Sequence, residues 1–261
     1  MGHIRLGVLP KTRKWQEVVA KLEVGDAVGG IARASFEAAE TDLESASTDP
    51  TFLESFWLLT QLPLAARGST FASDARSLGL PLPDNPSLTQ IASAFSAAVD
   101  QEAKRSGGRT DLGEMAQMAA TESLIAVIGP RLPSLFGPSP AEVQQAIGRF
   151  SSGQEFAVLG REFFTRLTQR VLHYYLSREL TNHVGSGRRF TSDAARADFD
   201  AALDLHCREA SRVLKEFVGG WYGKTVYRQR EGMTPEAVRR FAQIAFRKIR
   251  TEIRRRQDAD G

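Results

Sequence analysis

Residues 155–218 contain two long segments with helical apolar periodicity, and this pair constrains the fold more than any other part of the chain. The apolar residues of the first segment surround most of the helix: Phe156, Phe163, Phe164, Leu167, Val171, Leu172, Tyr174, Tyr175, Leu176 and Leu180. The second segment begins at the capping residue Ser192 and carries a single stripe: Phe199, Leu203, His206, Ala210, Val213, Leu214 and Phe217. A helix that is apolar on nearly all sides belongs in the middle of a bundle. We therefore expect a long central helix with the second helix packed against it, joined by an exposed loop that carries Arg188 and Arg189.

The remaining segments also predict helices. Ser87 with Gln90 and Ser139 with Glu142 have the spacing of capping boxes, and Asp49 before Pro50 is typical of a helix start. Proline-rich connectors at 79–87 and 129–140 separate these helices, and the glycines at 219–220 are expected to end the second long helix. The sequence has no long strand-like alternation. It predicts an all-α, irregular multi-helix bundle of about nine helices with a long central helix.

Two features suggest a division of the chain. The segment 105–110, RSGGRT, has the composition of a flexible linker. It would separate an N-terminal helical subdomain, residues 1–104, from a C-terminal helical bundle, residues 111–261, although one continuous domain is also compatible with the sequence. Residues 34–66 contain no Lys or Arg but have six acids, which predict an acidic face: Glu37, Glu40, Asp42, Glu44, Asp49 and Glu54.

The composition is that of an ordinary globular protein, with 42% hydrophobic and 25% charged residues. A single cysteine, Cys207, excludes an internal disulfide framework and a cysteine-rich zinc site. We find neither a secretory signal nor an apolar run of the roughly 20 residues that a membrane-spanning helix needs. We therefore expect a cytoplasmic protein with no membrane association. Only 7 of the 34 basic residues are Lys, a bias typical of GC-rich bacterial genomes.

The strongest functional feature is the final predicted helix, which Thr234 and Pro235 begin. Residues 228–256 contain ten basic and three acidic residues, a local net charge of +7, whereas the whole chain has +3. Five arginines fall in an arc of roughly 100° on the outer side of this helix: Arg239, Arg240, Arg247, Arg250 and Arg254. These five arginines are the candidate binding site. The sequence leaves open whether they bind an acidic protein partner, bind DNA or RNA, or only face solvent.

Other candidate chemistry is weaker. The segment 219–225, GGWYGKT, fails as a phosphate-binding loop because Val218 stands where the motif requires Gly. The central pair carries His173, Glu179, His183, His206 and Glu209, but no Glu-x-x-His motif of the kind found in di-iron bundles. The sequence therefore predicts no metal, no cofactor and no catalytic residue.

These observations leave three hypotheses. The leading one is a non-catalytic helical scaffold or adaptor subunit of a larger bacterial assembly, which contacts protein partners through charged surfaces. The second is a nucleic-acid-binding module that uses the arginines of the last helix. The third is an enzyme with an unrecognised site in the helical core.

Overall fold

The computed structural model describes residues 8–133, 137–228 and 233–260, except for the side chains of Arg228 and of residues 256–260. These ranges contain twelve α-helices, two 3-10 helices and no strand, which confirms the predicted all-α class but exceeds the predicted number of helices. The elements are α1 (Arg13–Glu23), α2 (Val28–Ala38), α3 (Glu40–Ala46), α4 (Pro50–Ala65), α5 (Phe71–Ser77), α6 (Leu88–Arg105), α7 (Asp111–Ile128), η1 (Gly129–Arg131), α8 (Pro140–Arg149), α9 (Gly153–Asn182), α10 (Asp193–Ala210), η2 (Ser211–Val213), α11 (Leu214–Arg228) and α12 (Pro235–Asp260).

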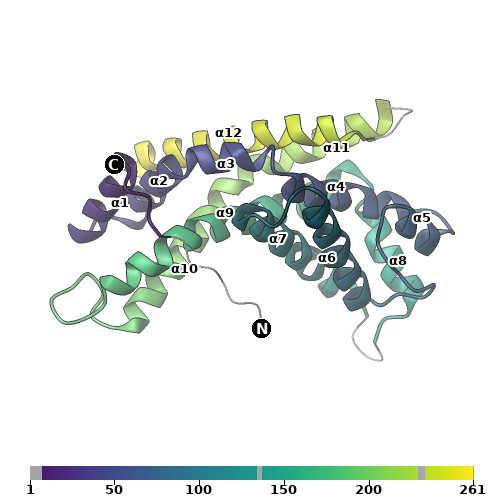
Figure 1. The fold of residues 1–261 in the computed structure, drawn as a ribbon, viewed down its shortest axis with the longest axis horizontal. Helices are drawn as coiled ribbons and strands as arrows, with labels where there is room; N and C mark the ends of the chain where they lie inside the picture. The colour runs from purple at the N-terminus through teal and green to yellow at the C-terminus, as the bar shows by residue number, and fades with distance from the viewer. Residues whose placement is uncertain (1–7, 134–136, 229–232, 261) are drawn as a thin grey trace.

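The molecule is elongated, with two groups of helices at its ends (Figure 1). Helices α1, α2 and α10 lie at one end, and α4 to α8 lie at the other. The two longest helices, α9 and α12, run between the ends, and α12 lies along one edge of the molecule. α12 packs against α2 and α3 as well as against α4 and α11. The last helix therefore contacts both ends of the molecule.

Helix α9 is the predicted central helix, with 30 residues and buried side chains around most of its circumference. Its Phe163 ring lies 5.2 Å from that of Phe56 on α4, and its Phe156 ring stacks 3.8 Å from that of Tyr222 on α11. Aromatic rings bury large apolar areas and gain further from such contacts. We call Phe56, Phe163, Phe164, Trp221 and Phe241 the aromatic junction, because these rings join α4, α9, α11 and α12.

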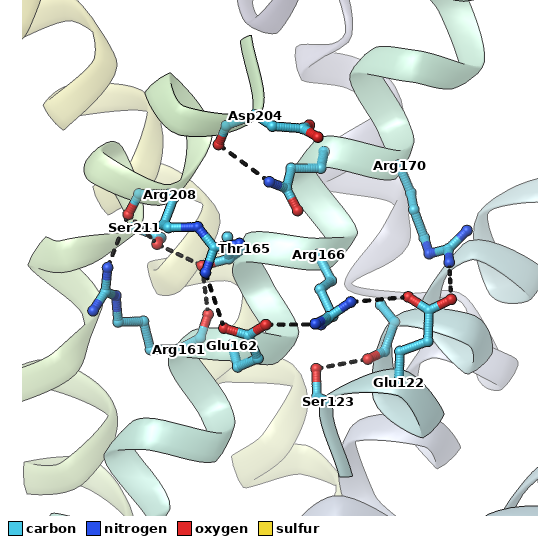
Figure 2. A network of polar contacts seen from close by, with 12 residues as sticks. Glu122, Ser123, Arg161, Glu162, Thr165, Arg166, Arg170, Asp204, Arg208 and Ser211 are labelled. Carbon is cyan, nitrogen blue, oxygen red and sulfur yellow. Dashed lines mark hydrogen bonds and ion pairs between the residues drawn. The ribbon is translucent and has the colours of Figure 1, made fainter. Parts of the chain in front are cut away.

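The second long helix is interrupted, contrary to the prediction. α10 ends at Ala210, η2 follows, and α11 starts at Leu214. At the break, the Arg208 carbonyl accepts hydrogen bonds from Arg161 Nη2 at 3.0 Å and from Ser211 Oγ at 2.8 Å. Figure 2 shows these donors beside Thr165, whose hydroxyl lies 2.5 Å from that of Ser211. Side chains thus satisfy this carbonyl where the helical pattern stops, and Val213 is 37% exposed rather than part of the apolar stripe.

The glycines at 219–220 do not end a helix, because α11 continues through them to Arg228. Gly219 instead allows α11 to approach α9 closely. A Cβ atom on Gly219 would lie 2.7 Å from the carbonyl oxygen of Gly153, and one on Gly160 would lie 2.6 Å from Val218 Cγ1. These glycines are therefore packing residues.

Two further helices account for the larger count. Residues 28–46 form two helices, α2 and α3, which meet at Ala39, and α5 is a short helix of seven residues. The capping boxes of Ser87 with Gln90 and of Ser139 with Glu142 are both formed. These two capping boxes therefore identified helix starts correctly.

Arg189 is not simply exposed in the loop between α9 and α10. Its guanidinium donates to the carbonyl oxygens of Leu22 and Asp26, at 3.3 and 2.6 Å, and lies 5.2 Å from the centre of the Phe199 ring. The last carbonyls of a helix lack partners within the helix, so a cation there is favourable. Arg189 thus ties the end of α1 to α10, whereas Arg188 is exposed as predicted.

Helices α6 and α7 pack against each other and against α4 across the 105–110 connection. A division of the chain at that connection remains a prediction. Among the helices that the structure describes, none combines the length and the apolar content that crossing a membrane requires.

Candidate docking surface on α12

The apolar side of α12 is buried and fixes the helix in place. Its inward residues are at most 4% exposed: Val238, Phe241, Ala242, Ala245, Phe246, Ile249 and Ile253. Three basic residues of the same region, Arg228, Arg230 and Arg256, and the acidic Glu231 lie outside the described side chains. The five candidate arginines all lie within the described part of α12, and the structure divides them into two sets.

The first set, Arg250 and Arg254, pairs with carboxylates of the predicted acidic segment. Arg250 contacts Glu40 at the start of α3, and Arg254 Nε lies 2.9 Å from Glu37 Oε1 on α2. We call these four residues the charged seam. Lys14 and Arg33 extend the seam, since Lys14 Nζ lies 3.5 Å from Glu40 Oε2 and Arg33 Nε lies 3.4 Å from Glu37 Oε1.

Two other acids of residues 34–66 also contact distant parts of the chain. Asp42 accepts a hydrogen bond from the Tyr175 hydroxyl at 2.5 Å. Asp49 caps α4 through the Phe52 amide and accepts from the Thr110 hydroxyl at 2.6 Å. Four of the six acids, Glu37, Glu40, Asp42 and Asp49, are thus engaged within the molecule. The predicted acidic face is therefore only partly free.

The second set, Arg239, Arg240 and Arg247, is exposed to solvent. None of the three forms an ion pair with another residue whose side chain the structure describes. Because the buried side of α12 is held by the core, these guanidinium groups project from a fixed helix. They form the part of the predicted site that is open to a partner.

A small hollow lies between α3 and α12, beside Arg247. Its walls combine apolar and charged side chains: Phe36, Glu40, Leu43, Glu44, Phe246, Arg247 and Arg250. About 20 Å³ of it is open to a water-sized sphere, roughly the room that one water molecule needs. The hollow is too small for an organic ligand of ordinary size, but it places apolar surface next to the exposed Arg247.

A second polar cluster links α7, α9 and α10 (Figure 2). Arg166 lies 2.8 Å from Glu162 and 3.2 Å from Glu122, which also pairs with Arg170. Gln169 donates to the Asp204 carbonyl at 3.1 Å. Cations and carboxylates alternate along this chain of contacts, an arrangement that connects three helices. We therefore assign it a structural role.

The histidines and the cysteine of the central pair give no catalytic arrangement. His173 Nε2 lies 2.8 Å from Asp204 Oδ1, and this hydrogen bond raises the pKa of His173. His206 is half-buried beside Gly29. Burial raises the pKa of the Cys207 thiol, which disfavours the nucleophilic thiolate. The described residues include no group of three or more His, Cys, Asp or Glu side chains placed to hold a metal ion.

Sequence reasoning found the arginine face but missed its division. The helix and the arc follow from local periodicity, whereas the pairing of Arg250 and Arg254 depends on where α2 and α3 lie. The run of acids at 34–66 was the one available signal, since a basic helix and an acidic segment in one chain can pair with each other. Neither family models, nor curated proteins, nor solved structures match this chain.

Proposed function

We propose that this protein is a non-catalytic helical subunit that docks an acidic protein partner through Arg239, Arg240 and Arg247 on α12. The observation that supports it most directly is the exposure of three guanidinium groups on a helix whose opposite side is buried. Such a helix loses little conformational entropy on binding, because its backbone is already ordered in the free protein. Arginine also suits carboxylates, which it can bind through two parallel hydrogen bonds.

The surroundings of the arginines favour a protein over a nucleic acid. The carboxylates of Glu40 and Glu44 line the same hollow as Arg247, and Glu37 lies beside Arg254. The sugar–phosphate backbone of a nucleic acid lying along α12 would be repelled by these carboxylates. A protein, in contrast, can place its own charges in a complementary pattern. The charged seam is an example of arginines of α12 that bind carboxylates on a neighbouring helix.

The proposal can be tested with the triple charge reversal Arg239→Glu, Arg240→Glu and Arg247→Glu. A matched control reverses three exposed arginines on other elements, Arg13, Arg149 and Arg178. Both variants change the net charge by the same amount, from +3 to −3, because each substitution removes two units. Any difference between them reports position rather than total charge.

Fluorescence anisotropy would compare three labelled probes at about 50 and 200 mM salt: polyglutamate, a short DNA duplex and a short RNA. We expect polyglutamate to bind the wild type and the control at low salt, and to lose affinity for the α12 variant. Binding of DNA or RNA at both salt concentrations that only the α12 variant loses, without polyglutamate binding, would replace the proposal with the nucleic-acid hypothesis. If no probe binds even at low salt, the arginines are a solvated face and the proposal is wrong.

A further inference from the structure

Three arginines of α12, two of the exposed set and one of the charged seam, are spaced regularly along one line. Arg240, Arg247 and Arg254 are seven residues apart, and seven residues turn an α-helix to within about 20° of two full turns while advancing it about 10.5 Å. The three side chains therefore form one ridge rather than a diffuse patch. Arg254 is 46% exposed at the side chain even though it contacts Glu37, so it borders the ridge as well as the charged seam.

On the ridge itself, the positions four residues after Arg240 and Arg247 are uncharged. Ile244, which is half-buried, follows Arg240 by four positions, and Thr251 follows Arg247 by four positions. Thr251 donates its hydroxyl to the Arg247 carbonyl at 2.9 Å, so its own hydrogen bond is satisfied within α12. The ridge thus alternates cationic and neutral positions at spacings of four and three. Residues at these spacings lie on one face of the helix, so a second helix that lies alongside can contact them at each repeat.

We infer that the partner element is an α-helix that lies along α12 and carries carboxylates seven residues apart, facing Arg240 and Arg247. This inference rests on the proposed function and specifies the form of its acidic partner. Helices that lie side by side repeat their contacts every seven residues, and charged residues at the edges of such contacts set partner choice and register. An acidic loop has no such repeat.

The molecule contains a contact of the same kind. Arg250 and Arg254 are four residues apart on α12, and they contact Glu40 and Glu37, which are three positions apart at the junction of α3 and α2. Two arginines one helical turn apart therefore meet two carboxylates on either side of the junction between α2 and α3. The ridge offers the next turns of the same helix to a helix from another chain.

The test uses two synthetic peptides of identical composition, rich in Ala and Gln, with helicity checked by circular dichroism. One peptide carries Glu at every seventh position, which places the carboxylates on one line. The other carries the same number of Glu residues at every fifth position, which distributes them around the helix. Anisotropy would measure the affinity of both for the wild type, for Arg240→Gln with Arg247→Gln, and for the control Arg13→Gln with Arg149→Gln.

We expect the seven-residue peptide to bind the wild type and the control about fivefold more tightly than the five-residue peptide, a factor that corresponds to about 1 kcal/mol. The variant with Arg240→Gln and Arg247→Gln should lose this preference. If the two peptides bind with equal affinity and the variant with Arg240→Gln and Arg247→Gln loses this binding, the seven-residue register is wrong. The acidic-partner proposal then still stands. Failure of both peptides together with polyglutamate would overturn both.

Discussion

The aromatic junction and the charged seam are two different kinds of contact, made by the first and the second half of α12. In the first half, Phe241 stacks on Trp221 at 4.0 Å and on Phe56 at 5.6 Å. In the second half, Arg250 and Arg254 bind carboxylates at a half-exposed boundary. Buried aromatic rings contribute several kcal/mol, whereas exposed ion pairs contribute little and are screened by salt. We therefore expect the buried rings, together with Ile249 and Ile253 in the second half, to stabilise the position of α12 more than the seam does.

The largest expected effect is at the junction. Phe56→Ala removes a fully buried ring that contacts Phe163, Phe164 and Phe241. We expect the free energy of unfolding to fall by about 3–5 kcal/mol, from lost burial and the cavity that remains. Urea unfolding measures the change, with Tyr227→Ala as the control because that ring is 91% exposed. Equal losses in the two variants would contradict the assignment of the junction as the main source of stability.

A second prediction separates two adjacent glycines of α11. Gly219→Ala places a Cβ atom 2.7 Å from the Gly153 oxygen, and it should destabilise the protein by about 1–3 kcal/mol because backbone has to move. A Cβ atom on Gly220 meets nothing within 4 Å. Gly220→Ala should therefore stabilise the helix by about 0.5–1 kcal/mol. Thermal unfolding of both variants tests the opposite signs, and a shift in the same direction would exclude the close crossing.

A third prediction concerns a carboxylate in the apolar part of α4. Burial, and secondarily the charge of Glu102, raise the pKa of Glu54 from 4.5 to about 7. The folded state therefore favours the protonated acid. This contribution is complete below pH 4.5 and is lost as the pH rises through about 7.

Glu54→Gln should accordingly leave stability little changed at pH 4 and raise it at pH 8, by on the order of 1 kcal/mol. Urea unfolding across this range measures the profile, with the exposed Glu44→Gln as the surface control. A gain that is the same at both pH values would show that charge is not its cause.

The smallest effect is expected at the charged seam. Arg254→Gln should lower the free energy of unfolding by about 0.2–1 kcal/mol at low salt, and the loss should shrink in about 1 M salt because the pair is partly exposed. The control is Arg255→Gln, since Arg255 is 78% exposed at the side chain and pairs within its own helix. A loss that does not depend on salt would mean that Arg254 acts through packing, and it would remove the contrast with the junction.

The features predicted from sequence are those encoded within a few residues. The capping box of Ser87 and Gln90 needs only residues three positions apart, and the arc of arginines needs only the periodicity of one helix. The features that were missed depend on residues far away. Gly219 reads locally as a helix stop, but its role depends on Gly153, and at the break after Ala210 the Arg208 carbonyl accepts a hydrogen bond from the distant Arg161.

The candidate site divides in the same way. Its five arginines could be named from the last helix alone. Which of them remain exposed could not, because Glu37 and Glu40 come from the beginning of the chain and reach α12 only when the tertiary structure is complete.

The contact between Glu37 and Arg254 joins positions 217 residues apart, and Arg189 caps the end of α1 from 167 residues away. During synthesis on a ribosome, α1 to α3 emerge long before either partner has been translated. Contacts of such high sequence separation form slowly, because long loops must close first. The carboxylates of Glu37 and Glu40 and the end of α1 therefore remain in water until Arg189 and α12 have been translated and can contact them.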